Sequence, residues 1–328
     1  GITTASNITG IAFDDYASFN SSTKKLTINS VSYSNSGKTL PSGIEIWVSD
    51  SKSTDIAFVA GSIKAPANCS SLFAYNSGVT LTNLATLMFK NFDTSNVTNM
   101  YSMFNGHTGS LKTLDLSCFD TSKVTNMQQM FYNSSSLTSI NVSSFNTSLV
   151  ITMANMFQGC ENITSFNVLN FNTINVTSMR AMFLGLKKVS SLDLTSFNTA
   201  KVTQMEYMFQ DSSGLTTINV SSFNTSSVTD MCYMFSGCGA LQTLDLSHFD
   251  TSKVTDMDGM FGDCGNLTTL KLSFNTSLVT YMNSMFCNCS KLTYLDLSSF
   301  NMSLVEDVED MFYECAKLSE IVTPQGIR

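Results

Sequence analysis

Charged residues are scarce in this sequence. They make up 13% of the chain, about half the usual share, so polarity comes mainly from Ser, Thr and Asn, as on many exported proteins. The formal net charge of −8 argues against nucleic acid or an anionic membrane surface as a partner. No apolar run approaches the roughly 18 residues of a membrane span, and no signal or lipidation motif is visible. We therefore expect a mature fragment that does not insert into a membrane.

Residue sets for catalysis are also missing. The chain has only two histidines, His107 and His248, and neither has a repeated acid or nucleophile nearby in sequence. No phosphate loop, zinc-protease motif or EF-hand loop occurs. The sequence predicts a protein that is not an enzyme, with no cofactor, no metal site and both histidines on the surface. An enzyme centred on Asp14 and Asp15 is the weakest alternative.

The chain is instead dominated by a repeat. A Met-Phe pair recurs nine times in steps of 25 to 27 residues, and a Phe followed by Asp or Asn moves in phase with it. Two markers that keep phase over nine copies indicate stacked repeats. The two irregular steps fall in expected surface loops, "MFNGHTGSL" and "KLSFNTS". The Met residues of the pairs are Met103, Met130, Met156, Met182, Met208, Met234, Met260, Met285 and Met311.

Each repeat has two apolar pieces. In the first, Leu114 and Leu116 alternate with polar residues, which predicts a short strand with one buried face. In the second, Val124, Met127 and Met130 are spaced by three residues, which predicts a short helix or 3₁₀ turn capped by Thr125. Stacking should join the strands into a continuous parallel sheet and bury the Leu, Val, Met and Phe columns.

The pattern predicts two regions. Residues 1–66 carry "KLTINSVSY", "GIEIWVS" and "DIAFVAG", which predict three or four antiparallel strands that cover the first rung. Residues 67–328 form the repeat solenoid, about nine repeats of 26 residues plus a partial capping repeat. The last strand piece, "LSEIV", is followed by Pro324 without a polar cap. We expect that the native protein continues, that residues 324–328 fold over the edge, or that this open end self-associates.

The phrase "CGALQTLDLSHFDTSKVTDMDGMFGDC", residues 238–264, resembles the repeat of the BspA-like leucine-rich-repeat family, also described as the mycoplasma-type surface-lipoprotein repeat. The resemblance covers residues 68–322. It implies a leucine-rich-repeat solenoid with a parallel sheet on one face and short helical turns on the other. It also implies a secreted or cell-surface protein, bacterial or protozoan, that adheres to host proteins, other microbes or matrix and is not an enzyme.

Cysteines and Asx residues also follow the repeat. For five cysteines we favour a ladder of buried thiols. Parallel side chains about 4.8 Å apart suit neither a disulfide nor a metal site, whose ligands must converge. Disulfides and a metal site remain the alternatives. Of the remaining four, Cys232 is predicted to be the most exposed. The Asp or Asn after each Phe predicts side-chain bonding to the turn backbone, with a calcium ladder as the alternative. The ladder cysteines are Cys160, Cys238, Cys264, Cys289 and Cys315.

The outward face of the strands is the candidate binding surface, because a solenoid usually recognises its ligand on an extended exposed face. Hydroxyl and acid or amide residues should form two columns there, and tyrosines of the turn half could add anchors. We expect an extracellular adhesin for a host or microbial surface protein or glycan. The alternatives are columns that only keep the sheet soluble, and a spacer or fibre subunit. The named candidates are Thr113, Asp115, Asn141, Ser191, Asp193, Thr217, Asn219, Thr243, Asp245, Tyr101, Tyr207, Tyr233 and Tyr281.

Overall fold

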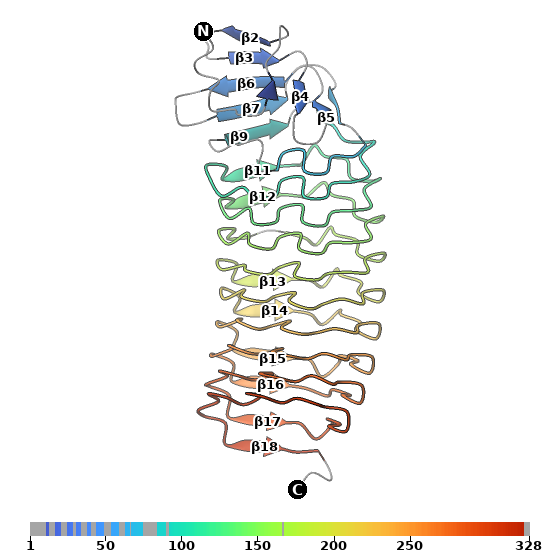
Figure 1. Cartoon of the computed structure of the whole chain (residues 1–328), viewed down its shortest axis with the longest axis vertical. Coiled ribbons are helices and arrows are strands. Elements are labelled where there is room, and N and C mark those ends of the chain that lie inside the picture. The colour runs from blue at the N-terminus through green and yellow to red at the C-terminus, as the bar shows by residue number, and fades with distance from the viewer. Residues whose placement is uncertain are drawn as a thin grey trace. The chain divides into compact units, whose positions relative to one another are not determined.

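The computed structural model confirms a repeat solenoid of the leucine-rich-repeat type (Figure 1). It describes residues 11–12, 17–20, 25–28, 31–33, 38–40, 44–48, 54–58, 63–65, 67–74, 84–89, 92–165 and 167–324. The chain divides into two compact units. The first unit comprises residues 1–149 and 160–170, and the second comprises residues 150–159 and 171–328. The boundary expected at residue 66 lies within the first unit and stays a prediction.

The first unit begins with the predicted antiparallel strands. One sheet has the order β2-β3-β6-β7-β9, and a second has the order β1-β4-β5. All neighbours in them are antiparallel except β7 and β9, which pair in parallel. Because β9 is the strand of the first repeat, the N-terminal sheet continues directly into the solenoid, as the expected cover of the first rung requires. The strands are β1 (Ile11–Ala12), β2 (Ala17–Asn20), β3 (Lys25–Ile28), β4 (Val31–Tyr33), β5 (Lys38–Leu40), β6 (Ile44–Val48), β7 (Thr54–Phe58) and β9 (Leu84–Phe89), with β8 (Ile63–Lys64) paired to β10 (Phe92–Asp93).

Most repeats supply one short strand, but these strands do not form the continuous sheet that we expected. In the described residues they pair in twos, in parallel and with equivalent residues opposite each other. Within the second unit Figure 1 shows β13 to β18 lying one above another in chain order. The ladder is therefore interrupted there between β14 and β15 and between β16 and β17. The pairs are β11 (Thr113–Asp115) with β12 (Ser139–Asn141), β13 (Ser191–Asp193) with β14 (Thr217–Asn219), β15 (Thr243–Asp245) with β16 (Thr269–Lys271), and β17 (Tyr294–Asp296) with β18 (Glu320–Val322).

The turn half of each repeat contains no helix in the part of the chain that the structure describes, so the predicted helix or 3₁₀ turn is wrong. The residue before each Met-Phe pair has a positive φ, and so does the residue two positions after the pair, as Gln129 (59°) and Asn133 (53°) show. A left-handed residue interrupts a right-handed helix, because the backbone cannot continue its hydrogen-bond pattern through it. The three-residue spacing instead reflects tight turns that point Val124, Met127 and Met130 inward.

Thr125 is not a helix cap. Its hydroxyl donates to the carbonyl of Thr98 on the preceding rung at 3.2 Å. The adjacent Asn126 has the capping role, because its Oδ1 accepts from the backbone N–H of Gln128 at 2.9 Å. Parallel bridges also join equivalent positions on this side, and in the second unit they run from Thr152 to Asp307 without a break. The bridges on the turn side therefore continue past the rungs at which the strands are not paired.

Stacked phenylalanines fill the interior. In the second unit the Phe of each Met-Phe pair stacks on its equivalent in the next rung, with centroids 5.4 to 5.9 Å apart and planes within 16°. Phe157, Phe183 and Phe209 begin this column and are fully buried. A fully buried Phe contributes about 1.5–3 kcal/mol by removal of apolar surface from water. The single repeat cannot bury these rings, so stability depends on the stack.

A column of buried threonines ties the rungs together. The Thr199 hydroxyl donates to the carbonyl of Asn224 on the next rung at 2.8 Å and accepts from the Asn224 N–H at 2.8 Å. Thr173 makes the same pair of bonds to Asn198. One hydroxyl thereby satisfies two backbone groups that the turn leaves unpaired. The column is Thr94, Thr121, Thr147, Thr173, Thr199, Thr225, Thr251 and Thr276, each at most 1% exposed.

Thr199→Val keeps the side-chain shape and removes both bonds. We expect the free energy of unfolding to fall by about 1–3 kcal/mol, because the Asn224 backbone groups lose their partner. Equilibrium urea unfolding measures this. Thr216→Val is the matched control, since the exposed Thr216 hydroxyl donates to the Ser190 carbonyl at 2.9 Å where water can replace it. Equal losses in the two variants would contradict the assignment.

Candidate functional site: the strand face and the turn edge

The structure places the predicted strand-face residues in two exposed columns. Asp193 lies opposite Asn219, and Asp245 lies opposite Lys271, whose ammonium is 3.3 Å from the Asp245 carboxylate. In the first unit Asn141 donates to Asp115 at 2.9 Å. The hydroxyl column beside them contains Thr113, Ser191, Thr217 and Thr243, all exposed.

The acids of this face are held in the ionised state by the following turn. Asp193 accepts from the Thr195 N–H at 3.0 Å and from its hydroxyl at 2.7 Å. These bonds hold the pKa of the Asp193 carboxyl below its ordinary value, and bonds from Ser247 do the same for Asp245. The Asp or Asn after each Phe bonds its turn in the same way, as Asp120 does with the Ser122 N–H at 2.9 Å. The predicted Asx role is therefore confirmed.

The strand face opens into a hollow between β14 and β15. The hollow has a volume of about 460 Å³, within the range typical of ligand sites. Because β14 pairs only with β13 and β15 only with β16 among the described strands, the two edges that face each other have no ladder partner. Polar side chains line both sides, namely Thr217, Asn219, Thr243, Asp245, Ser247 and His248.

His248 lies at the edge of this hollow. It precedes a Phe, in the position that other rungs fill with small residues such as Ser144 and Ser222. The Ser222 hydroxyl reaches the Leu194 carbonyl of the preceding rung at 3.0 Å. His248 reaches the equivalent Val220 carbonyl at 3.1 Å through Nε2, with its ring edge-on to Phe249. An imidazole is much larger than a hydroxyl, and β14 and β15 are not paired at this rung, whereas β13 and β14 pair where Ser222 makes the equivalent bond. The sequence singled out His248 only as a surface residue.

The four candidate tyrosines do not form one surface. Tyr207 and Tyr233 stack on adjacent rungs, with centroids 5.6 Å apart, and both are half-buried. Tyr233 in turn lies over Gly259, where an added Cβ would meet the ring at 2.3 Å. Tyr281 is exposed but belongs to the bridge column, and Tyr101 lies in the first unit. Only the Tyr207–Tyr233 pair forms a contiguous aromatic surface.

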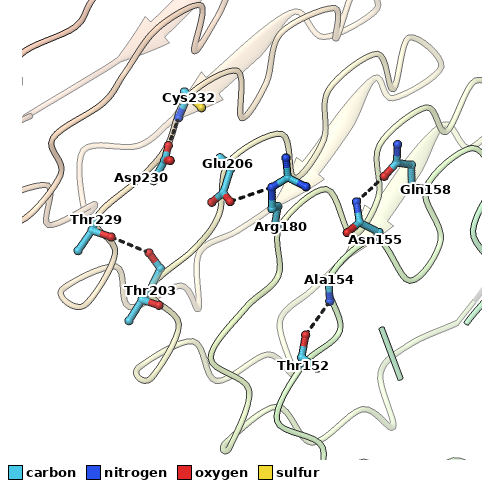
Figure 2. A network of polar contacts seen from close by, with 10 residues as sticks. All are labelled: Thr152, Ala154, Asn155, Gln158, Arg180, Thr203, Glu206, Thr229, Asp230 and Cys232. Atoms are coloured by element: carbon cyan, nitrogen blue, oxygen red, sulfur yellow. Dashed lines mark hydrogen bonds and ion pairs between the residues drawn. The ribbon is translucent and has the colours of Figure 1, made fainter. Parts of the chain in front are cut away.

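A charged cluster lies on the turn edge beside this pair (Figure 2). Arg180 Nε is 3.0 Å from Glu206 Oε1, and the Arg180 guanidinium lies 5.2 Å from the Tyr207 ring centroid. On the next two rungs Asp230, Cys232 and Asp256 place one ligand atom each within 4.8 Å of one another. Burial raises the pKa of the Glu206 carboxyl and raises that of the Cys232 thiol well above its usual range. Sequence reasoning missed this cluster, because its members occupy variable positions of the repeat.

The ladder cysteines are free thiols that bond between rungs. Cys160 donates to the carbonyl of Phe131 at 3.2 Å, and Cys238 donates to that of Phe209 at 3.2 Å. Burial raises the pKa of both thiols to about 12. Cys264 and Cys289 are also buried, and Cys315 is half-buried. Each thiol thereby satisfies a carbonyl of the preceding rung, as the Ser134 hydroxyl does for Phe104 at 2.6 Å.

Two surface predictions are wrong. Cys232 is 6% exposed, because it is packed among the neighbouring rungs of the turn edge, and the exposed cysteine is Cys118. His107 is also buried, because it occupies the position four residues after the Met of its pair, where Ser134 and Cys160 are buried on the following rungs. Its Nε2 donates to the Phe73 carbonyl at 2.7 Å. Burial lowers the pKa of His107 to about 4, although this hydrogen bond acts in the opposite direction.

Comparison with known proteins agrees with this geometry. The fold and its columns define a leucine-rich-repeat solenoid. The model of the family described as "Mycoplasma protein of unknown function, DUF285" matches residues 67–191, 151–264 and 238–323. The chain belongs to this family, and the resemblance to BspA-like repeats is confirmed. No curated protein sequence matches the chain.

Three solved structures with some similarity are bacterial leucine-rich-repeat proteins. A leucine-rich repeat protein from Bacteroides ovatus is 14% identical, with a TM-score of 0.32 over 85% of this chain and 75% of that one. A leucine rich cell surface protein from Faecalibacterium prausnitzii is 15% identical, with a TM-score of 0.24 over 87% and 94% of the two chains. A leucine-rich repeat protein from Eubacterium ventriosum is 18% identical, with a TM-score of 0.32 over 87% and 84%.

The buried His107 predicts a loss of stability in acid. Its folded pKa of about 4 lies below its ordinary value of 6.5, so only the unfolded chain takes up a proton as the pH falls through this range. Above about pH 6.5 His107 has no such effect. By pH 4 we expect a loss of about 3 kcal/mol in the free energy of unfolding.

Urea unfolding at several pH values tests this in wild type and His107→Gln. The wild type should lose stability more steeply with acid than the variant, since the carboxylates are common to both. Ser136→Ala serves as the control, because it removes a buried hydroxyl that donates to the His107 and Leu111 carbonyls but does not titrate, so its effect should be the same at every pH. Parallel profiles for wild type and His107→Gln would show that His107 is not the acid-sensitive group.

Proposed function

We propose that this protein is an extracellular or cell-surface binding protein, an adhesin that recognises its ligand on the strand face. The hollow between β14 and β15 carries the proposal. Four of its lining residues, Thr217, Asn219, Thr243 and Asp245, belong to the surface expected from the sequence, and His248 is a contact that the structure adds. Among the described residues no helix is long and apolar enough to span a membrane.

A protein ligand fits this hollow better than a glycan. The facing edges of β14 and β15 present backbone N–H and C=O groups that no neighbouring strand uses. An extended peptide can pair with such edges, so that main-chain bonds give affinity and side-chain contacts give specificity. Asp245 and Asn219 would add polar contacts on either side. The Tyr207–Tyr233 pair and Tyr281 are proposed as further anchors for the same class of ligand.

The experiment is a binding screen of the purified chain against peptide, matrix-protein and glycan arrays, followed by affinity measurement in His248→Ser. Serine occupies the equivalent position in rungs that pair normally, so this variant should fold and close the hollow. We expect affinity for a peptide or protein ligand to fall at least about tenfold, the loss of roughly 1.4 kcal/mol. Surface plasmon resonance measures the change.

Lys253→Ser is the matched control. Lys253 is exposed on the same rung as His248 and does not line the hollow, so affinity should not change. Three results would contradict the proposal: no ligand on any array, equal affinity in wild type and His248→Ser, or binding of glycans alone. The last result would keep the strand face as a binding surface and reject the extended peptide.

A second candidate is self-association through the last described rung, as in a fibre subunit. Its Phe312, Ile321 and Val322 are 36 to 37% exposed. If copies stack there, the mass measured by light scattering should rise with concentration in wild type and stay monomeric in Ile321→Lys. A monomer at all concentrations would reject this candidate.

A further inference from the structure

The turn edge of the second unit carries a group of side chains that the strand-face function does not use. Asp230, Cys232 and Asp256 each offer one ligand atom, and these atoms all lie within 4.8 Å of one another. Asp230 and Cys232 come from one rung and Asp256 comes from the next. The three atoms therefore converge, whereas the ladder cysteines repeat in parallel along the stack.

The turn itself does not need these charges. Asp230 Oδ1 accepts from the Cys232 N–H at 3.0 Å, and Asp256 Oδ1 accepts from the Asp258 N–H at 2.9 Å. Neutral asparagine makes the same bond at the equivalent positions of other rungs, as Asn126 does. In both aspartates this backbone bond uses Oδ1. The Cys232 thiol shares a side-chain hydrogen bond with the Asp230 carboxylate, and a bound cation would replace the thiol proton.

A buried carboxylate beside the group points to a missing cation. Glu206 is 5% exposed, and its Oε2 is the buried side-chain atom without a hydrogen-bond partner in the described part of the chain. Glu206 occupies the position of Cys232 on the preceding rung, where the Tyr207 N–H donates to the Cys232 carbonyl at 2.9 Å. Figure 2 shows Glu206 between Arg180 and Asp230. Arg180 Nε pairs with Oε1, and Oε2 has no hydrogen-bond partner among the described residues.

We propose that Asp230, Cys232 and Asp256 bind a zinc ion, with a water as the fourth ligand and the Glu206 carboxylate beside the site. A thiolate with carboxylates favours zinc over calcium or magnesium, which prefer oxygen ligands alone. Binding would release the thiol proton of Cys232 to solvent and form a zinc–sulfur bond. The ion would bridge consecutive rungs at the edge that carries the Tyr207–Tyr233 pair.

The experiment uses the full chain after reduction and removal of metal. Isothermal titration with zinc chloride should give one site per chain. Titration with Co²⁺, which takes the same ligands and is coloured, should give a thiolate-to-cobalt charge-transfer band. In Cys232→Ala the band should disappear and zinc affinity should fall at least about tenfold, and Asp256→Asn should weaken zinc to a similar extent. Far-ultraviolet circular dichroism checks the fold.

Both substitutions place a residue that the repeat already uses at the same position, since Ala154 is equivalent to Cys232 and Asn126 to Asp256. Cys118→Ala is the control, because it removes an exposed thiol outside the cluster and should leave zinc binding unchanged. Absence of saturable zinc binding would overturn the proposal. So would an unchanged cobalt band in Cys232→Ala, or calcium binding as tight as zinc binding.

Discussion

The structure depends on hydrogen bonding between equivalent residues of successive rungs. The backbone N–H of Phe209 donates to the carbonyl of Met234, and the Phe235 N–H donates to Met260, each at 2.9 Å. Because each rung presents the same groups at the same positions, most buried polar groups meet a partner on a neighbouring rung. The Thr199 hydroxyl extends this rule to side chains, since it closes two bonds to Asn224. A single repeat would leave these groups without partners.

The same constraint explains where the stack can vary. A change of size at one position must be absorbed locally, since the rungs on either side keep their contacts. At His248 a large ring takes the position of a serine, and the strands separate while the bridge from Asp230 to Asp256 on the turn side is kept. At Lys271 the missing residue leaves Leu272 half-exposed, and β16 does not pair with β17. Both interruptions lie on the strand face and alter its surface.

The turn edge carries charged and thiol side chains at positions that differ from one repeat to the next. Glu206 and Cys232 share one position on adjacent rungs, and residues as different as Ala154, Arg180 and Asn283 occupy it in other rungs. The close spacing of rungs brings such neighbours together, so side chains that are 26 residues apart become a cluster. A solenoid can therefore build a local site from single substitutions while the interior columns stay the same.

The sequence by itself determined the solenoid class, the register of the strands and the interior columns, because the period of about 26 residues and the alternation of Leu114 with polar neighbours follow directly from burial. It also determined the Asx turns. Only the tertiary structure decided that left-handed residues replace the expected helix, since spacing by three fits both a helix and a tight turn. It also decided that His107 and Cys232 are buried and that the ladder opens at His248. These outcomes depend on packing between rungs, which a pattern within one repeat does not contain.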